Sequence, residues 1–101
     1  MKTLLEFKDE IKAHNPCASE YKAFLYAKDE KERAMVVVSN LGWCCKNGLL
    51  ELIKATNSIV DITEGIKADN YWLAVRWAAY NDHPEVLKYL NSITEIPKKY
   101  L

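Results

Sequence analysis

The sequence repeats itself at a shift of 34 positions, and this periodicity limits the chain to a fold made of similar units. The ungapped identities are Ala34 with Ala68, Trp43 with Trp77, Asn47 with Asn81, Glu51 with Glu85, Lys54 with Lys88, Asn57-Ser58-Ile59 with Asn91-Ser92-Ile93, and Ile62 with Ile96. Small residues also align, since Cys44-Cys45 falls on Ala78-Ala79. Each unit is long enough for two short helices and a connecting loop.

Apolar residues recur at helical spacing along most of the chain and predict an all-α fold. The predicted helices cover residues 3–14, 18–28, 30–47, 49–56, 70–81 and 84–92. The run Val36-Val37-Val38 also suits a strand, but the helical pattern continues on both sides of it.

Local signals mark where these helices begin and end. Thr3 with Glu6 fits a capping box, and Asp29 is placed to cap the third helix. Gly48 lies where a left-handed C-terminal cap belongs, and Pro84 suits a first helical position. Residues 57–69 form the longest predicted connection, with a turn at Gly65.

Three further expectations concern the two ends of the chain. Basic and acidic residues alternate between Lys2 and Arg33, which is typical of a solvated helical surface. In the helix predicted over residues 18–28, the aliphatic stem of Lys28 is expected to belong to the buried stripe. The tail from residue 93 onward is expected to be loose, because Pro97 and Lys98-Lys99 argue against another element.

The period and the segment WAAYNDHPEVLKYL together resemble the ankyrin repeat. Ala78-Ala79, the turn Asn81-Asp82-His83 and the segment 85–88 follow the order of that family's inner helix, turn and outer helix. The family's Thr-Pro-Leu-His opening is absent, and Leu73-Ala74-Val75-Arg76 stands in its place. The resemblance implies a small stack of helix-turn-helix hairpins, an ankyrin-like α-solenoid, that binds another protein.

The length of 101 residues indicates one domain. Its predicted parts are an N-terminal helical hairpin and cap over 1–28, one repeat over 29–62, a second over 63–96, and a tail over 97–101. Fourteen basic residues balance fourteen acidic ones, so the chain has no electrostatic footprint for nucleic acid or an anionic membrane. No apolar run approaches the roughly 20 residues that span a bilayer. Three cysteines, two of them adjacent, indicate a reduced, cytoplasmic protein.

Aromatic residues and one arginine of the second predicted repeat, together with one tryptophan of the first, form the candidate partner-binding set. The set is Trp43, Tyr71, Trp72, Arg76, Trp77 and Tyr80. Trp, Tyr and Arg are the residue types most enriched at binding hot spots. The alternative is that the tryptophans stack between repeats as core, since large aromatic side chains are mostly buried. Trp43 and Trp77 are equivalent positions, so we expect them to be exposed together or buried together.

No catalytic or metal-binding constellation is visible in the sequence. Cys44 and Cys45 point about 100° apart on a helix and have no accompanying CxxC or HxxxH motif. His83 has no nucleophile nearby in sequence, so a turn role is favoured. We therefore expect a non-catalytic protein-protein interaction module without a cofactor. A self-associating structural unit, with a homo-oligomer, and a small inhibitor of a host or phage enzyme are the alternatives.

Overall fold

The computed structural model describes residues 2–68 and 72–98, with side chains within 2–67 and 76–98. Throughout these residues the chain is helical or irregular, and the all-α expectation is confirmed there. The elements are η1 (Leu4–Phe7), α1 (Lys8–Ala13), α2 (Ala18–Leu25), α3 (Glu30–Ser39), α4 (Leu41–Lys46), α5 (Leu50–Asn57), α6 (Thr63–Ala68), α7 (Trp72–Tyr80) and α8 (Pro84–Ile93). The described part of the predicted helix over 70–81 begins at Trp72.

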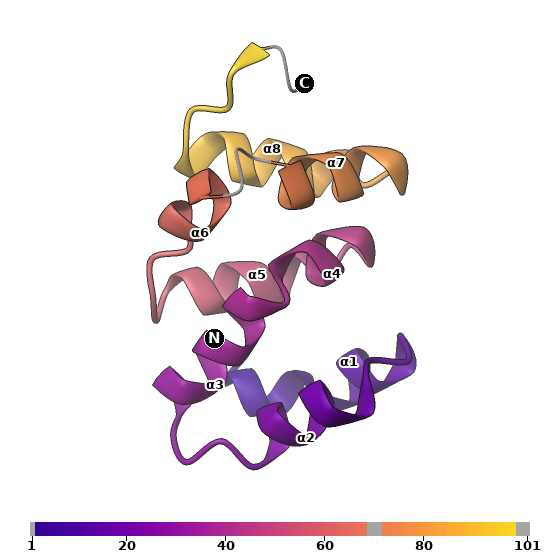
Figure 1. Cartoon of the computed structure of the whole chain (residues 1–101), viewed down its shortest axis with the longest axis vertical. Helices are drawn as coiled ribbons and strands as arrows, with labels where there is room; N and C mark the ends of the chain where they lie inside the picture. The colour runs from indigo at the N-terminus through magenta and orange to yellow at the C-terminus, as the bar shows by residue number, and fades with distance from the viewer. Residues whose placement is uncertain (1, 69–71, 99–101) are drawn as a thin grey trace.

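The helices lie in layers along the longest axis of the molecule (Figure 1). The pair α1 and α2 occupies one end, α4 and α5 the middle, and α7 and α8 the other end. Helix α3 connects the first layer to the second, and α6 lies between the second and the third. The molecule measures 39 × 24 × 24 Å, so its width is set by one pair of helices.

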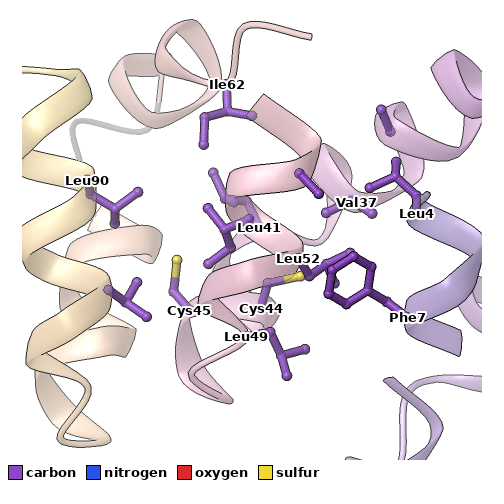
Figure 2. Packing of buried hydrophobic residues seen from close by; sticks show 14 of the residues in the cluster. Leu4, Phe7, Val37, Leu41, Cys44, Cys45, Leu49, Leu52, Ile62 and Leu90 are labelled. Atoms are coloured by element: carbon purple, nitrogen blue, oxygen red, sulfur yellow. The ribbon is translucent and has the colours of Figure 1, made fainter. Parts of the chain in front are cut away.

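A continuous apolar core passes through all three layers. Its largest fully buried aliphatic side chains are Leu4, Leu49, Leu52, Ile53, Ile62, Ile66, Leu90 and Val86. Burying each side chain of this size contributes about 1.5–3 kcal/mol. The adjacent cysteines serve different interfaces, because Cys45 lies toward Leu90 while Cys44 lies toward Phe7 (Figure 2).

Several helix boundaries follow the local signals of the sequence. The Asp29 carboxylate accepts a hydrogen bond from the Glu32 N–H at 2.8 Å, which confirms the cap of α3. Gly48 has φ +66°, and Pro84 opens α8, as predicted. These features depend on neighbours in the sequence, so the sequence alone indicates them.

The single helix predicted over 30–47 is wrong, because the chain bends at Asn40 between α3 and α4. The Asn40 side-chain amide donates to the Val36 carbonyl at 2.8 Å and to Glu20 Oε2 at 3.0 Å. An asparagine side chain that donates a hydrogen bond to a backbone carbonyl competes with the backbone hydrogen bonds of the helix. The break turns α4 away from α3 and into the second layer (Figure 1).

Two expectations for the N-terminal helices also fail. The Thr3 side chain makes no capping hydrogen bond, and the Leu4 N–H donates to Glu30 Oε1 at 2.6 Å. Helix α2 ends at Leu25 rather than at residue 28, and Lys28 is exposed. In both places a side chain of α3 forms hydrogen bonds with backbone groups at the helix end. No local sequence pattern indicates these contacts.

The connection contains a helix that the sequence does not predict, and the described part of the tail is more ordered than predicted. Residues 63–68 form α6, and Gly65 lies inside this helix instead of in a turn. In the tail, Thr94 is buried and Ile96 is 3% exposed, so this part of the chain packs on the third layer. Residues 99–101 of the predicted tail lie outside the described residues.

Hydrogen bonds recur at the same shift of 34 positions as the sequence. At the end of α4, Leu49 N–H donates to Cys44 O at 3.0 Å and Gly48 N–H to Cys45 O at 3.2 Å. At the end of α7, His83 N–H donates to Ala78 O at 2.9 Å and Asp82 N–H to Ala79 O at 3.3 Å. Both pairs form a Schellman motif, and Asp82 adopts φ +58° where Gly48 has φ +66°.

Side-chain hydrogen bonds repeat in the same way. The recurring pairs are Asn47 Nδ2 to Trp43 O with Asn81 Nδ2 to Trp77 O, Ser58 Oγ to Ala55 O with Ser92 Oγ to Tyr89 O, and Ile62 N–H to Asn57 Oδ1 with Ile96 N–H to Asn91 Oδ1. The aligned residues therefore occupy the same local structure in both units.

Arg33 on α3 ties together the end of α2, the start of α3 and, through Glu30, the start of η1. Its Nε donates to the Phe24 carbonyl at 2.7 Å, and its Nη2 donates to the Ala27 carbonyl at 3.1 Å. Its Nη1 pairs with Glu30, whose other carboxylate oxygen accepts from the Leu4 N–H. Arg33 is only 7% exposed, so the expectation that it belongs to a solvated charged surface is wrong.

We predict that Arg33→Ala lowers the free energy of unfolding by about 3 kcal/mol, because it leaves the Glu30 carboxylate and the carbonyls at the end of α2 without their buried partner. Lys31→Ala removes an exposed cation from the same helix and is the matched control. Urea denaturation followed by circular dichroism measures both variants. Equal midpoints for the two variants would contradict the role given to Arg33.

Candidate functional site

The structure describes four of the six predicted partner-binding side chains. These are Trp43 on α4 and Arg76, Trp77 and Tyr80 on α7. Tyr71 lies outside the described residues, and Trp72 opens α7 with its side chain outside them.

Arg76 and Tyr80 lie one turn apart on α7 and contact each other. Arg76 Nη2 donates to the Tyr80 hydroxyl at 2.9 Å, and the guanidinium lies 5.0 Å from the centre of the Tyr80 ring. Tyr80 is 69% exposed. A cation over an exposed ring contributes about 0.5–1 kcal/mol, so the main effect is to hold both side chains in one arrangement.

Trp77 receives a second cation from the neighbouring layer. Lys46, at the end of α4, places its Nζ 5.2 Å from the Trp77 ring centre. Trp77 is 37% exposed, so part of the residue remains accessible. Lys46, Arg76, Trp77 and Tyr80 together are called the aromatic surface below.

The end of α7 fixes the place of these side chains. Asn81 Nδ2 donates to the Trp77 carbonyl at 2.9 Å, and the left-handed Asp82 turns the chain into α8. These two features end α7 directly after Tyr80, and they fix the backbone that carries Trp77 and Tyr80.

Trp43 has a different environment from Trp77. It is partly buried and lines a cavity of about 70 Å³ between α2 and α3–α4, together with Tyr21, Phe24 and Asn40. This cavity is far smaller than the usual range for a ligand pocket. The two equivalent tryptophans each cover part of the layer on their N-terminal side; Trp43 is partly buried and Trp77 is 37% exposed.

Lys46 is the member of the aromatic surface that sequence reasoning missed. Under the shift of 34 it aligns with Tyr80, and it lies three residues after Trp43. That alignment placed it on the same helix face as a candidate residue and could have identified it. Its contact with Trp77 depends on the packing of α4 against α7, which the sequence does not show.

The cysteines differ sharply in accessibility. Cys44 and Cys45 are 2% and 0% exposed, and desolvation by burial raises the pKa of the Cys44 thiol well above its usual range. Cys17 is exposed, and hydrogen bonds from the Ser19 side chain and from the backbone of Glu20 and Ser19 lower its pKa.

His83 has a packing role in the turn before α8. Its Nδ1 lies 3.4 Å from Glu85 Oε1, and its ring closes against Gly48 in the other unit. Among the described residues, no group of three or more His, Cys, Asp or Glu side chains is placed to hold a metal ion.

No family model matches this chain, and neither a curated protein nor a solved structure matches it. In the part of the chain that the structure describes, no helix has both the length and the apolar character needed to cross a membrane.

We predict that a disulfide reagent labels one thiol rapidly in the native protein and the other two slowly. Because the pKa of Cys17 is lowered, its rate should reach half its maximum at a lower pH than that of an ordinary cysteine thiol. Stopped-flow labelling over a pH series measures this, and Cys17→Ser should remove the fast phase. Rapid labelling of Cys44 or Cys45 would contradict their burial.

Proposed function

We propose that this protein is a non-catalytic protein-protein interaction module and that the aromatic surface is its contact site. The observation that carries the proposal is the arrangement of Trp77 and Tyr80, each exposed and each held beneath a cation. Trp, Tyr and Arg dominate the energy of protein interfaces. Side chains already held in place lose less conformational entropy when a partner binds.

The partner is another protein, and the interaction needs no cofactor. The chain has equal numbers of acidic and basic residues, which gives little attraction for nucleic acid or an anionic membrane. The three cysteines, Cys17, Cys44 and Cys45, are not joined in disulfides, which supports a reduced, cytoplasmic location.

For the architecture, we propose a short helical repeat of the ankyrin kind. The repeats cover 29–62 and 63–96, and residues 1–28 cap the first of them. The support comes from the Schellman motifs and side-chain hydrogen bonds that recur at the shift of 34 positions. In this arrangement α4 and α7 are neighbouring inner helices, so Lys46 and Trp77 belong to one continuous binding face.

We predict that Tyr80→Ala and Trp77→Ala each weaken partner binding at least about tenfold, because both remove exposed ring area from the contact. Capture from a lysate of the native host, followed by mass spectrometry, identifies the partner. Calorimetric titration of the purified partner then compares the variants with the wild type.

Tyr26→Ala is the matched control, since Tyr26 is 80% exposed but lies at the end of α2 in the first layer. It should bind like the wild type. Circular dichroism confirms that all three variants are folded. Wild-type affinity in both Tyr80→Ala and Trp77→Ala would contradict the proposed contact site.

A further inference from the structure

The third layer has an outer face that corresponds to a covered face of the second layer. Ala79 and Tyr80 on α7 align with Cys45 and Lys46 on α4. On α8, the aligned pairs are Leu87 with Ile53, Lys88 with Lys54, and Asn91 with Asn57. Ala79, Tyr80, Leu87, Lys88 and Asn91 are called the end face below.

In the second layer these positions form the interface with α7 and α8. Cys45 and Ile53 are fully buried. Lys54 places its Nζ 5.6 Å from the Tyr89 ring centre, and Asn57 Nδ2 donates to the Tyr89 hydroxyl at 3.2 Å. The chain thus shows what covers such a face: another pair of helices that brings a tyrosine to the lysine and the asparagine.

In the third layer the same positions face solvent. Ala79, Lys88 and Asn91 are exposed, and Leu87 is only partly buried. Asn91 nevertheless keeps the backbone contact of its counterpart, because its Oδ1 accepts from Ile96 N–H at 3.2 Å. This contact holds the Asn91 side chain in the same orientation as its counterpart Asn57, whose Nδ2 donates to the Tyr89 hydroxyl.

We propose that the end face is covered by the end face of a second copy of this chain, which gives an end-to-end dimer. The second copy brings the required chemistry, since Tyr80 is a 69% exposed tyrosine and its aligned residue in the second layer, Lys46, reaches across to Trp77 of the next layer. In a two-fold dimer each copy supplies both the tyrosine and its receptor. The balanced charge of the chain adds no net repulsion between copies.

The size of the face suits a reversible dimer. The cross-section of the stack is 24 × 24 Å, so contact over this face buries roughly 1,100 Å² in total. That area lies at the low end of specific interfaces, where association is transient. We therefore expect a reversible equilibrium between monomer and dimer rather than an obligate assembly.

Sedimentation equilibrium of the full chain over a concentration series up to about 1 mM tests this proposal. The wild type should shift from the mass of one chain to that of two. Ala79→Arg places a long cation in the end face, at the position where the aligned Cys45 of the second layer is fully buried, and should raise the dissociation constant at least tenfold.

Ala23→Arg is the matched control, because Ala23 is an exposed alanine in the last turn of α2 at the opposite end of the stack. It should dimerise like the wild type. A wild type that stays monomeric, or an Ala79→Arg variant that dimerises equally well, would overturn the dimer. Partner capture by a monomeric wild type would leave the proposed function intact, so the two failures are distinguishable.

Discussion

The close approach of the second and third layers at Gly48 is the contact on which the rest of the structure depends. Gly48 has φ +66°, and a Cβ atom added there would lie 2.5 Å from two atoms of the His83 ring. Glycine is therefore favoured by the left-handed backbone conformation, which Asp82 adopts at the equivalent position, and it is required by the lack of space beside the His83 ring. The neighbouring contacts are also made by small residues, since Cys45 and Ala78 are fully buried between α4 and α7. Larger side chains at these positions would separate the two layers.

Much of the local structure could be predicted from the sequence, because it depends on residues a few positions apart. The Asp29 cap, the left-handed Gly48 and the start of α8 at Pro84 are of this kind. The shift of 34 also predicted which side chains occupy equivalent places. Arg33 shows the limit of this reasoning, because its partners are carbonyls of another helix and their positions depend on tertiary packing. The same cause explains the bend at Asn40, whose side chain reaches Glu20 on α2.

The candidate site shows the same division between local and tertiary information. Arg76 and Tyr80 are one turn apart, so their contact follows from the helix itself. Lys46 reaches Trp77 only because α4 and α7 lie side by side, and this makes the aromatic surface a property of two units. The end face follows from the same stacking. The second layer presents Lys54 and Asn57 to Tyr89 of the third layer, and the aligned residues Lys88 and Asn91 of the third layer are exposed to solvent.

The packing of one unit against the next is tested most directly by nuclear magnetic resonance at Gly48. The stacked arrangement predicts a nuclear Overhauser effect between a Gly48 Hα proton and His83 Hε1, with that Hα proton shifted by the imidazole ring current. Gly65 is the internal reference, because its nearest neighbour is the Val38 Cγ1 methyl group, 3.6 Å from an added Cβ atom. An ordinary Gly48 shift without that Overhauser effect, in a protein whose helices are formed, would contradict the stacking of the two units.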